Sequence, residues 1–156
     1  LYIQVLNKSE KAERYAWILE NVPKLPGSGI IYCLTQRDCD YLAEFLRKHK
    51  IAAAAYYSRD GEEGEAINHK IEEDFRNNRL KAIVATIKLG MGYDKGDIAF
   101  VIHYQMPLIR TQYLILYNNL QVHYILHIQM HQTFETNYTA TFHFLPLYPN
   151  MPENFL

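Results

Sequence analysis

The feature that most constrains this chain is an alternation of short apolar runs and amphipathic segments between residues 10 and 103. Four apolar runs have the length and composition of buried strands: residues 29–34, 51–57, 82–86 and 98–103. Three other segments repeat their apolar residues at the spacing of one helix face: residues 10–21, 38–48 and 62–77. The alternation predicts an α/β fold, an open and mostly parallel β-sheet with helices on both faces.

Three local expectations refine this pattern. We expect Ser9 to be the N-cap of the first helix. The run at 51–57 contains four alanines, so a helix competes with a strand there. In the second helix, the spacing predicts an inward face made of Tyr41, Leu42, Phe45 and Leu46.

The loops that follow the predicted strands are the expected place for a site, because parallel sheets bind ligands outside the carboxyl ends of their strands. The loop after the first strand holds Thr35, Gln36 and Arg37, directly before a helix. Hydroxyl, amide and guanidinium groups beside free backbone N–H groups suit contact with phosphate. Thr35 or Asp38 can instead be the N-cap of that helix, and the two roles are compatible.

The loop after the third strand is rich in glycine. Gly90, Gly92 and Gly96 lie within seven residues and allow the backbone to approach a ligand closely. Thr86, at the end of the strand, can donate to a phosphate oxygen, and Asp94 can accept from a ribose hydroxyl or bind a cation. A tight turn without any ligand explains the same glycines, because Gly-x-Gly alone is a weak signal.

Three stretches in this order resemble the second RecA-like motor domain of RecQ-family ATP-dependent DNA helicases: GIIYCLTQRDCDYLAEFL, IAAAAYY and AIVATIKLGMGYDKGDIAFVIHYQMP. The resemblance covers about residues 1–107. It implies single-stranded or duplex DNA as a partner, with Thr86 on a phosphate and Thr35, Gln36 and Arg37 near the translocating strand. Phosphate contacts of this kind hold DNA without reading its sequence, as a translocating motor requires.

The resemblance also implies a nucleotide site shared between two motor domains. Gly90, Gly92, Asp94 and Lys95 would face ATP across the cleft, with Mg²⁺ present only when the first motor domain of the same protein completes the site. The 156 residues contain no Walker A sequence and no Asp-Glu-x-His box. We therefore assign no catalytic residue and expect no ATPase activity from this chain alone.

The family's arginine motif does not appear after the strand at 98–103, where Arg110 is the only arginine. This departure favours a first alternative, a non-catalytic helicase-like module that binds nucleic acid or protein. A second alternative is a small nucleotide- or phosphate-binding α/β protein unrelated to helicases, against which the ordered match of three motifs argues.

The tail after Pro107 differs in character from the rest of the chain. Its only residues among Lys, Arg, Asp and Glu are Arg110, Glu135 and Glu153. We therefore separate a motor-like domain at 1–107 from a divergent tail at 108–156, which is a genuine sequence, an altered reading frame or a wrongly joined region.

On a helix, His123, His127 and His131 would share one face, but they would span about 12 Å, too far for one ion. We assign no metal site.

Length, charge and cysteine content limit the kinds of protein to which this chain can belong. A chain of 156 residues is about one domain, and its net charge of −1 creates no strong overall attraction to nucleic acid. Cys33 and Cys39 are expected to be reduced thiols rather than part of a disulfide scaffold. No signal peptide or apolar stretch of membrane-spanning length is evident. The expected location is the cytoplasm, or the nucleus in a eukaryote, without a membrane partner.

Overall fold

The computed structural model describes residues 2–7, 10–86, 98–105 and 124–129, with the first and last of these ranges described as backbone alone. The elements follow one another as β1 (Tyr2–Asn7), α1 (Lys11–Asn21), the 3₁₀ helix η1 (Val22–Lys24), β2 (Ser28–Tyr32), α2 (Gln36–Lys48), β3 (Ala53–Tyr56), α3 (Gly61–Arg76), β4 (Ala82–Ala85), β5 (Ile98–His103) and β6 (Tyr124–Gln129). The three predicted helices and the four predicted strands are all present, and the run at 51–57 forms a strand.

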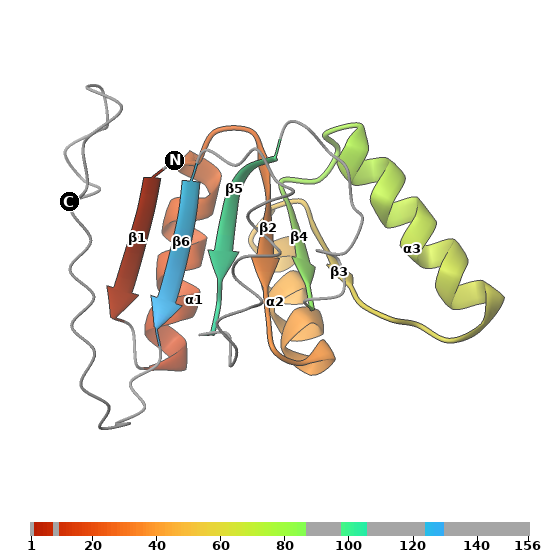
Figure 1. Cartoon of the computed structure of the whole chain (residues 1–156), viewed down its shortest axis with the longest axis horizontal. Helices are drawn as coiled ribbons and strands as arrows, with labels where there is room; N and C mark the ends of the chain where they lie inside the picture. The colour runs from red at the N-terminus through yellow and green to blue at the C-terminus, as the bar shows by residue number, and fades with distance from the viewer. Residues whose placement is uncertain (1, 8–9, 87–97, 106–123, 130–156) are drawn as a thin grey trace.

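The described strands form a six-stranded sheet in the order β1-β6-β5-β2-β4-β3, as Figure 1 shows from one edge to the other. Every strand pair is parallel. The predicted α/β architecture is therefore confirmed. Two strands were not expected from the sequence. They are β1 and β6, and β6 lies between β1 and β5, so the sheet contains residues beyond Pro107.

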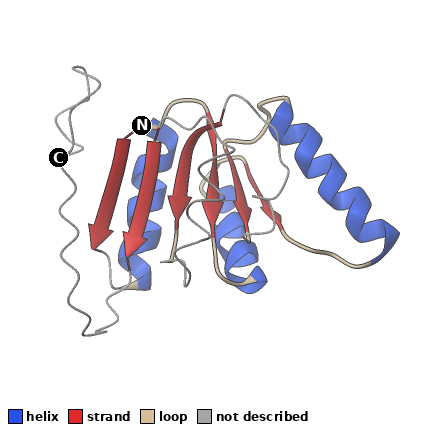
Figure 2. Ribbon diagram, in the orientation of Figure 1, coloured by secondary structure: helices blue, strands red, loops and turns tan. Residues whose placement is uncertain are grey.

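The central strands are buried on both faces, and their side chains alternate between two clusters. On one face, α1 and α2 cover Ile31, Val84 and Ile102. On the other face, α3 places Phe75 against Ile83 and its neighbours. Figure 2 shows the helices outside the single layer of strands. This arrangement explains the nearly continuous apolar runs, since a strand covered on both faces has no solvent side for polar residues.

Two expectations about the helices are wrong. The N-cap of α1 is Glu10 rather than Ser9, and the Glu10 N–H donates to the Glu13 carboxylate at 3.3 Å. Ser9 itself lies outside the described residues. In α2, Leu42 and Leu46 are buried as predicted, whereas Tyr41 is 47% exposed. The buried face of α2 is completed by Cys39 and Ala43, so Tyr41 falls beside that face and not within it.

The tail forms a strand at 124–129, so the shared helical face considered for three histidines does not form there. His127 lies within β6, while His123 and His131 lie outside the described residues. Within the described parts of the chain, no group of three or more His, Cys, Asp or Glu side chains is placed to hold a metal ion. No helix among those residues is long and apolar enough to span a bilayer.

Candidate nucleic-acid interface

The carboxyl ends of β5, β2, β4 and β3 meet at one edge of the sheet, because these neighbouring strands are all parallel. The chain stays paired as it leaves each strand. The Cys33 N–H donates to the Ala85 carbonyl at 2.9 Å, and the Tyr104 N–H donates to the Tyr32 carbonyl at 2.9 Å. The segments that follow β2, β4 and β5 are thus held side by side at this edge.

Thr35 is the N-cap of α2, as one of the two sequence interpretations proposed. Its hydroxyl accepts from the Asp38 N–H at 3.1 Å and donates to the Asp38 carboxylate at 2.7 Å. A threonine hydroxyl has one proton, and here that proton is used by Asp38. The hydroxyl can therefore donate to a phosphate only by giving up its bond to Asp38.

Gln105, which follows β5, ties this loop to the neighbouring strand. Its side-chain oxygen accepts from the Leu34 N–H at 3.0 Å, and its side-chain nitrogen donates to the Asp38 carboxylate at 2.9 Å. The contact joins residues 71 positions apart in the sequence. A loop held at both ends in this way presents the first turn of α2 in a fixed position.

Gln36 and Arg37 occupy that first turn. Backbone N–H groups in the first turn of a helix have no partner inside the helix, and the helix dipole favours an anion there. The Gln36 side chain donates to the Ser58 carbonyl at 3.4 Å, which links α2 to the loop after β3. The Arg37 guanidinium lies over the ring of Tyr41, 5.3 Å from its centroid. An exposed cation and a helix N-terminus therefore coincide at this point.

Thr86 follows β4 at the same edge and is half-buried. Its N–H donates to the Tyr56 carbonyl at 3.3 Å. Since Tyr32 and Ala85 are register partners, Thr86 lies level with Cys33, close to the start of α2. The structure thus brings Thr35, Gln36, Arg37 and Thr86 to one edge. The other predicted site residues lie outside the described residues: Gly90, Gly92, Asp94 and Lys95.

The loop after β3 contains a cluster that the sequence reasoning did not assign to the site. The Tyr57 hydroxyl lies 3.0 Å from both carboxylate oxygens of Asp40, and the Arg59 guanidinium lies 4.1 Å from the centre of the Tyr57 ring. Burial and the Asp40 carboxylate raise the pKa of Tyr57, and the Arg59 charge opposes that shift. Arg59 also donates to the Ala55 carbonyl at 3.0 Å, so this cation is held in place by the protein.

The two cysteines lie beneath this edge. Cys33 and Cys39 are both buried and unpaired by any disulfide, which agrees with the prediction of reduced thiols. Burial, followed by the contact with Cys39, raises the pKa of the Cys33 thiol well above its ordinary value. A buried neutral thiol is a poor nucleophile, so Cys33 is a packing residue.

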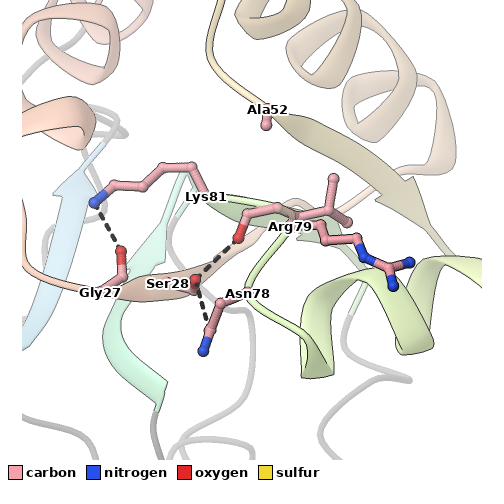
Figure 3. A pocket seen from close by; sticks show the side chains of 7 residues that line it. Gly27, Ser28, Ala52, Asn78, Arg79 and Lys81 are labelled. Atoms are coloured by element: carbon pink, nitrogen blue, oxygen red, sulfur yellow. Dashed lines mark hydrogen bonds between the residues drawn. The ribbon is translucent and has the colours of Figure 1, made fainter.

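The opposite edge of the sheet carries a hollow of about 540 Å³ at the amino ends of β2, β3 and β4 (Figure 3). Its polar groups bind other parts of the protein. The Lys81 ammonium donates to the carbonyls of Leu25 and Gly27, and burial lowers the pKa of Lys81. The Ser28 hydroxyl donates to the Leu80 carbonyl at 2.9 Å. These bonds fasten the strand starts together, which makes the carboxyl edge the better candidate site.

Comparison with known protein families identifies the family of this chain. Residues 11–133 match the family described as "Helicase conserved C-terminal domain". The chain belongs to this family. The match passes Pro107 and includes β6, so it extends beyond residues 1–107, the stretch that resembles RecQ helicases.

Individual relatives confirm the resemblance to RecQ-family helicases. The chain is 40% identical over 80 residues to ATP-dependent DNA helicase RecQ of Haemophilus influenzae, covering 51% of this chain and 12% of that protein. It is 35% identical over 119 residues to ATP-dependent DNA helicase Q1 of Rattus norvegicus, covering 72% and 18%. A mimivirus protein named as an ATP-dependent RNA helicase is 37% identical over 108 residues, covering 69% and 19%. The matched part of the chain is therefore a fifth or less of each relative's length.

Solved helicase structures share the fold of this chain. The C-terminal domain of the DEAD-box protein Dbp5 superposes with a TM-score of 0.67 at 17% identity, covering 85% of this chain and 78% of that one. Mycobacterium smegmatis helicase Lhr, solved with single-stranded DNA and AMP-PNP, gives a TM-score of 0.68 at 19% identity, covering 85% and 20%. These likenesses support the RecA-like architecture of a helicase C-terminal domain.

Proposed function

We propose that this chain acts as the second motor domain of an ATP-dependent DNA helicase and contacts the phosphates of single-stranded DNA with the carboxyl edge of its sheet. The observation that carries the proposal is the placement of the loop at 35–37 and Thr86 at that one edge. Membership of the helicase C-terminal family and the similarity to RecQ DNA helicases support it.

Each residue has a distinct part in this contact. Arg37 supplies a positive charge, and the backbone N–H groups of Gln36 and Arg37 supply donors at the start of α2. Thr35 holds those donors in position through its bonds to Asp38. Thr86, at the end of the neighbouring strand β4, donates its hydroxyl proton to a phosphate of the DNA. None of these groups reads a base, which suits a motor that moves along any sequence.

The nucleotide part of the proposal concerns Gly90, Gly92, Asp94 and Lys95. These residues would face ATP from this side of a cleft, and the first motor domain would supply the phosphate loop and the Mg²⁺ ligands. On this account the chain alone does not hydrolyse ATP, and closure of the two motor domains around ATP shifts the grip on DNA.

The experiment is a fluorescence anisotropy titration of the chain with labelled oligothymidylate at several salt concentrations. We expect weak, salt-sensitive binding. Arg37→Ala should reduce the affinity, and it should also reduce the slope of log K against log salt concentration by about 0.7, the value for one lost phosphate contact on a single strand. Arg79→Ala is the matched control, because Arg79 is an exposed arginine beside the hollow at the opposite edge. Equal losses in the two variants, or no DNA binding at low salt, would refute the proposal.

The second candidate function is a non-catalytic helicase-like module. The presence of only one arginine, Arg110, after Pro107 favours it. The two candidates differ in how DNA binding responds to ATP in the parent protein. A motor domain changes its DNA affinity when ATP is bound and hydrolysed, whereas a module binds DNA equally with and without ATP.

A further inference from the structure

We propose that Tyr41 is a stacking platform for a base of the single-stranded DNA whose phosphates bind at the start of α2. This inference rests on the function proposed above and adds a base contact to it. Three large apolar side chains are exposed in the described part of the chain: Leu34 (40%), Tyr41 (47%) and Ile67 (43%). Two of them, Leu34 and Tyr41, flank the loop at 35–37.

Cations from two helices lie near the ring of Tyr41. The Arg37 guanidinium of α2 is 5.3 Å from the ring centroid, and the Lys11 ammonium of α1 is 5.5 Å from it. Lys11 is also 5.5 Å from the centroid of the Tyr15 ring, which belongs to the partly buried layer above the core. An exposed aromatic ring beside positive charges is the combination by which proteins bind single strands, with the ring on a base and the charges on the backbone.

The acidic residues near Tyr41 are engaged elsewhere. The Asp38 carboxylate accepts from Thr35 and Gln105, and the Asp40 carboxylate accepts from the hydroxyl of Tyr57, in the loop after β3. Glu44 pairs with Lys48 at 2.8 Å, one turn further along α2. These neutral donors leave the Asp38 and Asp40 carboxylates charged but hold them toward Thr35, Gln105 and Tyr57, whereas Lys11 and Arg37 lie within 5.5 Å of the ring centroid. A backbone phosphate beside the ring would therefore meet these two cations.

The position of the ring along α2 matches a base attached to a bound phosphate. Arg37 and Tyr41 are four residues apart and share one face of the helix, about 6 Å apart along its axis. A phosphate held at the first turn therefore leaves its attached nucleoside within reach of the Tyr41 ring. Stacking on a tyrosine does not distinguish strongly between bases, so the contact is compatible with translocation.

The test compares two oligonucleotides of about 15 nucleotides, one of thymidines and one whose central nucleotides are abasic. On the thymidine strand, Tyr41→Ala should lower the affinity of the chain by about 5- to 150-fold, and Tyr41→Phe should restore it to within about twofold. On the abasic strand, Tyr41→Ala and the wild type should bind equally, because the phosphates remain and only the stacking partner is gone. Ile67→Ala, an exposed apolar residue of α3, is the control for loss of surface area.

The outcomes separate this inference from the function on which it rests. If Arg37→Ala loses DNA binding and Tyr41→Ala does not, the stacking role of Tyr41 is refuted, whereas the phosphate contact at the start of α2 is supported. Equal losses in Tyr41→Ala on both strands also overturn it, because the ring then supports the cations or a protein contact rather than a base. If the wild type binds neither strand at low salt, both proposals fail.

Discussion

Replacing Thr35 with alanine should lower the free energy of unfolding by about 1–2 kcal/mol. Loss of an N-cap costs about 1 kcal/mol, and the Thr35 hydroxyl is the group that accepts from the Asp38 N–H at 3.1 Å. Its second bond, to the Asp38 carboxylate at 2.7 Å, lies on an exposed surface and adds only about 0.5 kcal/mol. For a chain of this size, the sum corresponds to a fall in Tm of about 2–8 °C.

The assay is urea denaturation followed by circular dichroism and by the fluorescence of Trp17, the single tryptophan of the chain. Thr35→Ser is the matched control, since serine caps helices as well as threonine does, and it should lose less than about 0.5 kcal/mol. If serine destabilises as much as alanine, or if alanine changes nothing, the cap does not hold this loop. Thr35→Ala should also weaken DNA binding less than Arg37→Ala, because the hydroxyl proton is already used by Asp38.

Three further predictions concern two buried residues of the sheet, with the exposed Gly61 as a control. Gly29→Ala should destabilise the fold by about 3 kcal/mol or more in the same urea assay, because its Cβ would lie 2.3 Å from the Phe100 ring and 2.4 Å from the Phe100 carbonyl oxygen. Gly61→Ala is the comparison. Open space surrounds Gly61, so this change should cost only about 1–2 kcal/mol, through the positive φ of the residue. Tyr32→Phe should leave stability at neutral pH unchanged or raise it by up to about 1 kcal/mol, because no group in the described part of the chain bonds the buried Tyr32 hydroxyl. Burial raises the pKa of Tyr32 above its ordinary 10.0, so the wild type should lose stability as the pH rises above about 10, where the unfolded chain ionises and the folded one keeps its proton. Stability measured against pH should fall less steeply for Tyr32→Phe, and equal slopes would contradict this assignment.

The central strands could be predicted from sequence because their apolar character is local and continuous. Residues 82–85 and 98–103 are buried on both faces, so every residue of each run reports the same environment. The strand at 124–129 was not predicted, because it lies within a tail with few charges and joins the sheet through pairing with β1 and β5. Pairing between strands so far apart in the sequence leaves no local pattern.

In the candidate site, too, a feature set by neighbouring residues was predictable, whereas contacts between distant parts of the sequence were not. The cap formed by Thr35 was predictable, since a threonine three residues before an aspartate at a helix start is a local signal. The contact of Gln105 with Leu34 and Asp38 depends on β5 lying beside β2, and no spacing in the sequence reveals it. Tyr41 was placed on the wrong face, because a one-residue difference rotates a side chain by about 100° around the helix.

The most direct test of the proposed interface is an NMR titration of the ¹⁵N-labelled chain with unlabelled oligothymidylate at low salt. If DNA binds at the carboxyl edge of the sheet, the backbone amide signals that move should be those of residues 33–41, 57–59 and Thr86. The signals of Gly27, Ser28 and Lys81, at the opposite edge, should stay in place. Shifts confined to that opposite edge, or no shifts at all, would contradict the account.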